Sequence, residues 1–217
     1  VIDGQQRLTT LQLLFDAILE EIRKLGFEDA ARRLVDLVEN GQHQRKSDED
    51  QFKVWPTNRD REAFSEVMGT PTPQYSKLAN KGSKIVKAHE YFASQAAEWL
   101  AAEPEQARIR VDALVEAVAM RLQIVTIDLQ PDEDAQEIFE TLNARGTPLT
   151  AADLIKNLVF QRLGASPAEA EKAYHQYWRH FETEFWEVEV SSGRVLYSRS
   201  SLFLTQWLIS QTRQEIP

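Results

Sequence analysis

Cysteine is absent from this 217-residue chain, which excludes disulfides and cysteine-based zinc sites. No apolar run approaches the ~18 residues that a membrane span needs, and no signal peptide is visible at the start of the sequence. Positive charge is also scarce, because 25 Lys and Arg stand against 34 Asp and Glu and give a net charge of −9. Bulk attraction to nucleic acid is therefore not expected, and any such contact needs a local basic patch. The lack of cysteine fits a reducing compartment, so we expect a cytoplasmic protein.

Apolar residues are present in sufficient amount for a proper core, since 42% of the chain is hydrophobic and it contains five Trp and ten Phe. The length suits one domain, or one domain with a helical extension. The sequence does not begin with Met and opens inside an apolar pair, Val1-Ile2, that leads straight into a turn. We interpret it as a segment of a longer protein, with at least one strand expected upstream.

Helices dominate the predicted architecture, because apolar residues recur at steps of three and four along most of the chain. The clearest example runs from Leu8 to Leu25, and Gly26 fits its C-terminal cap. Further helices are expected at about residues 28–39, 83–101 and 104–122, and a short one ends at residue 68. Two more helices are expected to begin at about residues 132 and 150, a long aromatic one to run from 167 to 185, and a last one to lie around 202–208. Val1-Ile2 is typical of a strand end, and Gln123 to Leu129 of a buried strand. The predicted fold class is mainly α with a small β component near Val1 and Ile124.

Residues 3–7, Asp-Gly-Gln-Gln-Arg, stand between the expected strand end and the first helix. The first N–H groups of a helix lack internal partners and attract anions, and Gly4 permits a positive φ or a close backbone approach. Arg7 can clamp a phosphate with two parallel hydrogen bonds. Gln5 and Gln6 can orient a water or bond a base or sugar, and Asp3 can hold Mg²⁺. A plain turn, two solvated glutamines and an Arg7 paired with an acidic neighbour explain the same residues, so spacing alone leaves both interpretations open.

Residues 138–157 form a second informative stretch, in which a tight loop joins two expected helices. Asn143 and Gly146 suit turn conformations, and Arg145 would lie at the loop tip. Helix capping fully explains Thr150 and Asp153. Asn143 and Arg145 exceed what a connecting turn needs, which leaves a binding role open for them.

Both stretches resemble one known family. Residues 1–11, Val-Ile-Asp-Gly-Gln-Gln-Arg-Leu-Thr-Thr-Leu, look like the signature of the GmrSD N-terminal family, which is similar to the ParB and sulfiredoxin folds. In those relatives a related Gly-x-x-Arg element at a helix start binds a nucleotide phosphate. Residues 138–157 resemble the family's second motif, and Trp55-Pro56-Thr57 resembles its short Pro-Thr element. The resemblance implies a truncated ParB/sulfiredoxin-like core with a helical insertion over residues 1–163 and a helical extension over 164–217.

The function implied by this resemblance is a module that binds and hydrolyses a nucleoside triphosphate, GTP above others, together with Mg²⁺. It would belong to a phage-defence protein that restricts modified or foreign DNA, and it would regulate a nuclease located outside this segment. The implied catalytic residues are Asp3, Gln5, Gln6 and Arg7, with Asp3 also the metal ligand. The implied nucleotide-binding residues are Gly4, Arg7, Thr9, Asn143, Arg145 and Gly146. Two alternatives keep the fold: the domain is itself a ParB-like DNA nuclease, or it is a non-catalytic sensor of DNA or nucleotide.

Two further sets of residues are weaker candidates. Lys77, Lys81, Lys84 and Lys87 would share a helix face that could touch DNA phosphate, but Gly82 interrupts the segment and a solvated face is favoured. The four histidines, at positions 43, 89, 175 and 180, have no metal-ligand spacing. We therefore expect them to be structural or on the surface.

Overall fold

The three- and four-residue spacing of apolar side chains does produce helices in the first part of the chain. The computed structural model describes residues 4–47, 50–126, 150–163, 167–193 and 195–212. The long helices before residue 127 are α1 (Gln5–Lys24), α2 (Glu28–Val38), α3 (Arg61–Met68), α4 (Lys84–Ala101) and α5 (Ala107–Glu116). Gly26 adopts a φ of 80° just past the end of α1, which confirms the predicted stop.

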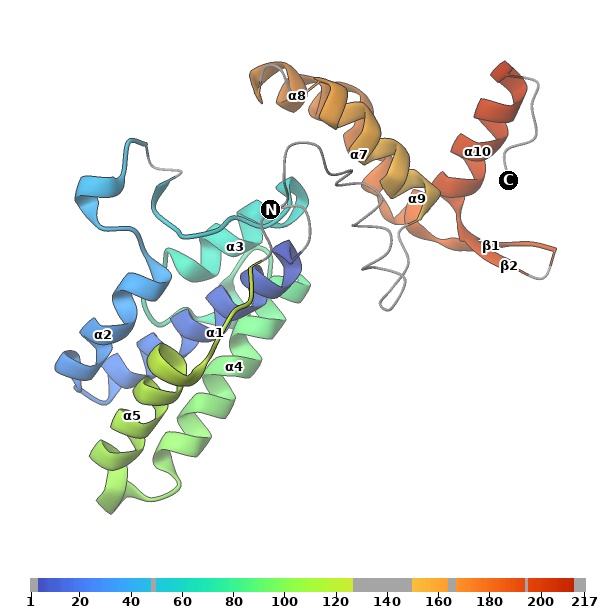
Figure 1. The fold of residues 1–217 in the computed structure, drawn as a ribbon. Coiled ribbons are helices and arrows are strands. Elements are labelled where there is room, and N and C mark those ends of the chain that lie inside the picture. The colour runs from blue at the N-terminus through green and yellow to red at the C-terminus, as the bar shows by residue number, and fades with distance from the viewer. Residues whose placement is uncertain (1–3, 48–49, 127–149, 164–166, 194, 213–217) are drawn as a thin grey trace. The chain divides into compact units, whose positions relative to one another are not determined.

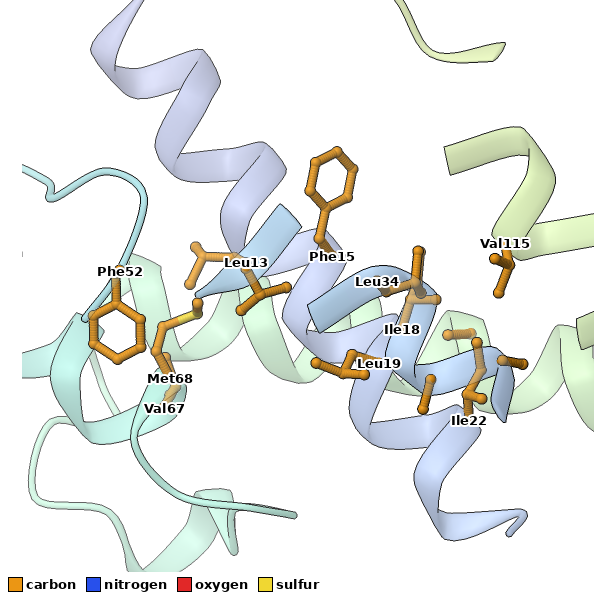
Figure 2. Packing of buried hydrophobic residues seen from close by; sticks show 14 of the residues in the cluster. Leu13, Phe15, Ile18, Leu19, Ile22, Leu34, Phe52, Val67, Met68 and Val115 are labelled. Atoms are coloured by element: carbon orange, nitrogen blue, oxygen red, sulfur yellow. The ribbon is translucent and has the colours of Figure 1, made fainter. Parts of the chain in front are cut away.

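Two compact units make up the chain, Val1–Leu129 and Gln130–Pro217. In the amino-terminal unit, α1 packs against both α2 and α4 (Figure 1). Its core joins side chains from all five helices, and Figure 2 shows part of it. The fully buried members include Leu13, Leu19, Ile22, Leu34, Phe64, Val86, Leu100, Val111 and Val115. The predicted division at residue 163, which separates a functional core from an extension, stays a prediction.

An extended segment brings three aromatic rings together beside α3. Phe52 forms an isolated antiparallel bridge with Glu39. Its ring lies 5.3 Å from that of Trp55 and 5.5 Å from that of Phe64, in edge-to-face arrangements that aromatic pairs prefer. The residues up to Pro56 continue without helical structure, as the proline predicts for Trp55. This segment therefore holds Trp55 against the core.

Polar side chains of α1 are buried alongside the apolar ones. Gln12, Asp16 and Glu20 follow one another at steps of four, and each bonds a different neighbour. The Gln12 amide donates to the carbonyl oxygen of Leu37 in α2 at 2.7 Å. Asp16 bonds His89 of α4 at 2.9 Å, and Glu20 accepts the backbone N–H of Thr72 at 3.0 Å. A helix predicted to have one apolar face thus also carries a buried polar stripe.

The segment after Pro104 differs from its prediction. Its helix ends as α5 at Glu116 and is followed by a wider helical turn over Ala117–Arg121. Val111 and Val115 are buried, whereas Ile109 and Leu122 are exposed. Gln123 to Thr126 form no strand, and Val125 is 86% exposed, so the expectation of a buried strand is wrong for these residues. No described residue pairs with them, and a strand requires a hydrogen-bonded neighbour; residues 127–129 lie outside the described ranges.

The carboxy-terminal unit contains α7 (Ala151–Leu163), α8 (Pro167–Ala173), α9 (Glu184–Glu187) and α10 (Arg199–Thr212). Its small core consists of Ala152, Tyr174, Trp178 and Leu204. The prediction of a single long aromatic helix after Pro167 is wrong. The α-helix ends with α8 and is followed by a wide helical turn, a tight helical turn and the short α9. The capping arrangement at the start of α7 is confirmed: Thr150 Oγ1 donates to Asp153 Oδ2 at 2.6 Å, and the Asp153 N–H donates back at 3.2 Å.

The β component is a two-stranded antiparallel hairpin, β1 (Glu189–Ser192) and β2 (Val195–Ser198). It pairs Val190 with Tyr197 and follows α9 directly. The fold class, mainly α with a small β component, is confirmed. Of the two places expected for that component, Ile124 is in no strand, and Val1-Ile2 lies outside the described ranges. Among the described residues, no helix is both long and apolar enough to cross a membrane.

Candidate functional site

The first candidate site is the amino end of α1, where the backbone starts from a left-handed residue. Gly4 has a φ of 98°, a conformation that side-chain-bearing residues rarely adopt, and no side chain caps the helix there. The first backbone bond of the helix runs from the Leu8 N–H to the Gly4 carbonyl at 2.8 Å. The amides of Gln5 and Gln6 precede this bond, and such amides point out of a helix end toward an approaching anion.

Arg7 lies in the first turn of α1 with an exposed side chain. Its guanidinium lies close to the start of the helix. Arg7 Nη2 is 3.9 Å from the position that a Cβ would occupy if Gly4 were replaced by alanine. The sequence-based expectation that Gly4 and Arg7 serve one site is thus compatible with their closeness. A guanidinium beside outward-pointing amides provides several N–H donors for a tetrahedral oxyanion.

The two glutamines of the motif differ in their surroundings. Gln5 Nε2 donates to the carbonyl oxygen of Trp55 at 3.1 Å, which ties the extended segment to the first turn of α1. The Gln6 side chain is exposed, and its backbone carbonyl accepts the Thr10 hydroxyl at 2.8 Å. Their predicted role in orienting a water stays a prediction.

Thr9, which was expected to bind nucleotide, is buried, with only 5% of its surface exposed. Its Oγ1 has no hydrogen-bond partner among the described residues. The remaining predicted site residues, Asp3, Asn143, Arg145 and Gly146, lie outside the described ranges. The structure therefore brings together Gly4, Gln5 and Arg7 and leaves the meeting of the two motifs as a prediction.

A cavity beside the extended segment was not predicted from the sequence. It is a shallow hollow of about 530 Å³ that opens broadly to solvent, and it is lined by Trp55, Arg61, Glu62, Ser65, Glu66 and Asn80. The Arg61 guanidinium lies 5.1 Å from the Trp55 ring centre, a cation–π arrangement. The Trp-Pro-Thr string is the part of this lining that gave a signal, through the family resemblance. Asn80 gave none, because its position depends on tertiary contacts.

Glu66, one of the lining residues, fixes the loop that carries Asn80. Its carboxylate accepts the backbone N–H groups of Ala79 at 2.6 Å and of Asn80 at 3.0 Å. The Asn80 amide hydrogen bond, followed by that of Ala79, lowers the pKa of Glu66 below its ordinary value. Glu66 is thus ionised near neutral pH, and it holds the loop that carries Asn80 in place.

A buried hydrogen-bond chain connects α1, α4 and the segment before α4. His89 has no exposed surface, and its Nε2 bonds Asp16 while its Nδ1 lies 2.9 Å from the Tyr75 hydroxyl. A neutral His89 that donates to the Asp16 carboxylate accepts the Tyr75 proton, so all three groups are satisfied. Burial raises the pKa of Asp16, while the bond to His89 opposes this, and burial followed by the charge of Glu21 raises the pKa of Tyr75. His89 is structural, one of the two roles predicted for the histidines.

Within the described ranges, no group of three or more His, Asp or Glu side chains is arranged to hold a metal ion. The features so far define a class: a helical domain whose first helix begins at a left-handed glycine and carries an exposed arginine in its first turn. Residues 1–160 match the family described as GmrSD restriction endonuclease, N-terminal domain, and the chain belongs to this family. Comparison with curated proteins and with solved structures finds no match. The family makes the chain part of a restriction protein that acts in phage defence.

Proposed function

We propose that the amino end of α1 binds the phosphates of a nucleoside triphosphate, and that this domain couples nucleotide hydrolysis to a nuclease outside the chain. The observation that carries the proposal is the combination of a left-handed Gly4, the outward-facing first turn of α1, and the Arg7 guanidinium next to it. Membership of a restriction endonuclease family supports a role in DNA restriction. GTP is the nucleotide we put first, and modified or foreign DNA is the partner of the full protein.

Each residue of the first turn has a distinct part in this proposal. The helix-end amides and Arg7 hold phosphate oxygens and stabilise the charge that develops during transfer to water. Gln6, which is exposed, can orient the attacking water, while Gln5 is engaged with the Trp55 carbonyl and positions the neighbouring segment. Asn143, Arg145 and Gly146 would complete the pocket from the second motif. Mg²⁺ would accompany the triphosphate and neutralise its charge, with Asp3 as its protein ligand.

Phosphate release by the full protein tests the role of Arg7. We expect Arg7→Ala to lower turnover of GTP by about 10²–10³-fold, the cost typical of removing one donor to developing negative charge. Arg7→Lys should recover part of the activity, because a lysine keeps the charge but loses the bidentate geometry. Arg32→Ala is the matched control, since Arg32 is an exposed arginine of α2. Equal turnover by wild type and Arg7→Ala would refute the proposed role.

The two alternatives predict different outcomes with the same proteins. A domain that is itself a nuclease would nick DNA in a metal-dependent way without any nucleotide. A non-catalytic sensor would bind nucleotide or DNA without turnover. Assays with GTP, ATP and CTP, each with and without modified DNA, separate these outcomes from the proposed hydrolysis.

A further inference from the structure

Four lysines lie together in a chain that is otherwise strongly acidic. Residues 67–89 contain Lys77, Lys81, Lys84 and Lys87 and no Asp or Glu, in a protein whose net charge is −9. We propose that these four side chains, the lysine surface, contact the phosphate backbone of double-stranded DNA. This inference goes beyond nucleotide binding at α1 and does not depend on it. It is carried by the placement of the lysines, their lack of ion pairs, and their position in the helix.

Two of the lysines project from the outer side of α4. Lys84 and Lys87 are one turn apart at the start of this helix, so they share a face. Tyr91, four residues further along, extends the same face and is 61% exposed. The core residues of α4, such as Val86 and Leu100, lie on the opposite side, and α4 packs against α1 (Figure 1). The face with Lys84, Lys87 and Tyr91 therefore points away from the core.

The other two lysines lie on tight turns that lead into α4. Lys77 and Lys81 are exposed, and the backbone N–H of each donates to the carbonyl three residues before it, at 2.9 and 3.4 Å. Between them, Glu66 accepts two further backbone amides at 2.6 and 3.0 Å. Gly82 does interrupt the segment, because α4 begins only at Lys84. Three residues separate Lys81 from Lys84, so their Cα atoms are at most about 11 Å apart.

None of the four lysines forms an ion pair within the described residues. Other lysines do pair with carboxylates, as Lys24 does with Glu21 and Lys156 with Glu182. Glu66, the acidic residue just before the stretch, uses its carboxylate on backbone amides instead. The charges of the lysine surface are therefore not neutralised by described carboxylates, and an anion from outside can approach them.

The helix position of Lys84 and Lys87 argues against the plain alternative of a solvated helix face. Cations stabilise a helix at its carboxyl end and destabilise it at its amino end, where the dipole is positive. Lys84 is the first residue of α4 and Lys87 the fourth, while the last turn contains no basic residue. Two like charges one turn apart add repulsion. The two lysines thus destabilise the helix that carries them, and a polyanion that neutralises them would relieve this.

Duplex DNA is the polyanion that suits this surface. It carries one negative charge per about 1.7 Å of its axis, so a row of lysines meets several phosphates wherever it binds. Lysine and tyrosine side chains both contact DNA phosphates, and Tyr91 supplies a hydroxyl beside the lysines. The family is one of restriction endonucleases, which act on DNA. Backbone contacts position a protein without reading the bases, so we expect the lysine surface to bind modified and unmodified DNA equally.

The salt dependence of DNA binding tests the inference. Fluorescence anisotropy on the full protein, without nucleotide, would follow a short unmodified duplex between about 0.05 and 0.2 M NaCl. Each lost phosphate contact lowers the slope of log K against log salt by about 0.9. We expect Lys84→Ala/Lys87→Ala to lower the slope by about 1.8 and to weaken binding about 10–100-fold at 0.1 M salt. Lys84→Arg/Lys87→Arg, which keeps both charges, should bind as wild type does.

Two further variants make the test specific. Arg32→Ala/Arg33→Ala removes two exposed positive charges from α2 and is the charge-matched control, so it should leave the slope unchanged. Lys77→Ala/Lys81→Ala lies outside α4 and should lower the slope by about 1.8 as well, without any change to the start of that helix. Hydrogen exchange in α1 and α4 confirms that each variant keeps its fold.

Several results would overturn the inference. One is an unchanged slope in both lysine variants, and another is an equal loss in the arginine control, which would assign the effect to net charge. A wild-type protein that does not bind the duplex at low salt would also refute it. So would lysine variants that lose binding only to single-stranded RNA or to phosphatidylserine vesicles. Because no nucleotide is present, these outcomes are independent of whether the amino end of α1 binds phosphate.

Discussion

The replacement of His89 by alanine is the most informative perturbation of the fold around the site. His89 is fully buried between Asp16 of α1 and Tyr75 of the loop before α4, and it bonds both at 2.9 Å. Its removal leaves the Asp16 carboxyl, which is 5% exposed, without its histidine partner in the interior. Loss of a hydrogen-bond partner that leaves a buried acceptor unsatisfied costs about 1–3 kcal/mol, and more when the acceptor is a carboxylate. The Tyr75 hydroxyl is only half-buried and adds little, since it can find water.

The measured quantity is the free energy of opening from native-state hydrogen exchange, followed in peptides of α1 and α4. This readout separates the amino-terminal unit from the carboxy-terminal one, which a global signal would mix. His43→Ala is the control, because His43 is exposed, and it should change stability by less than about 0.5 kcal/mol. In a double-mutant cycle, Asp16→Asn should remove much of the effect of His89→Ala, with a coupling of about 1–3 kcal/mol. Additive effects, or a cost below about 1 kcal/mol for His89→Ala, would refute the reasoning.

Three other changes have defined outcomes. Burial raises the pKa of Asp16, so the folded state keeps the carboxyl proton at pH values just above 3.8, where the unfolded chain has lost it, and the free energy of unfolding falls as pH rises through this window. Asp16→Asn should remove this pH dependence in urea unfolding followed from about pH 4 to pH 7. The same pH dependence in wild type and variant would contradict the assignment. Gly4→Ala should cost about 1–2 kcal/mol at the start of α1, seen as faster amide exchange there, because its φ is 98°; Gly82→Ala, in open space, should cost less than half of that. Thr150→Ala should destabilise α7 by about 1 kcal/mol through loss of its cap, and unchanged exchange in α7 would exclude a capping role.

Helix positions followed from the sequence because apolar spacing and end signals agree. Leu8 to Leu25 repeats at helical spacing and stops at Gly26, and the structure ends α1 at Lys24 with Gly26 in a left-handed conformation. Thr150 and Asp153 predicted a cap that depends only on residues three apart. Signals of this kind act within one turn, so they are visible without knowledge of the tertiary fold.

The parts that escaped prediction depend on partners distant in the sequence. Asp16 and Glu20 look like solvent-facing residues of an amphipathic helix, yet they are buried because His89 and the Thr72 amide are there to bond them. Val125 looked buried because its neighbours are apolar, but no described strand lies beside it. The hairpin at 189–198 had a local signal, with β-branched and aromatic residues on either side of Gly193, that was masked by the aromatic helical pattern before it.

The candidate site divides in the same way. The helix start at Gly4 with Arg7 in its first turn could be predicted, because a glycine, a helix start and an arginine are adjacent in the sequence. The cavity could not, since Trp55 and Asn80 are 25 residues apart and meet only through the contacts of α3 and Glu66. Chemistry that a single turn contains can be recognised in a sequence, whereas chemistry that a fold assembles requires the coordinates.

The buried polar side chains of α1, Gln12, Asp16 and Glu20, affect the orientation of the amino end of this helix. Apolar side chains alone would allow a helix to slip or roll between neighbouring packings at modest cost. However, three hydrogen bonds join α1 to three different segments, through Gln12, Asp16 and Glu20. A rotation of the helix about its axis by one residue would break all three bonds together. The rotation of α1 about its own axis is therefore fixed by contacts in its middle. The side of the helix from which Arg7 projects depends on contacts that begin about one and a half turns further along the helix.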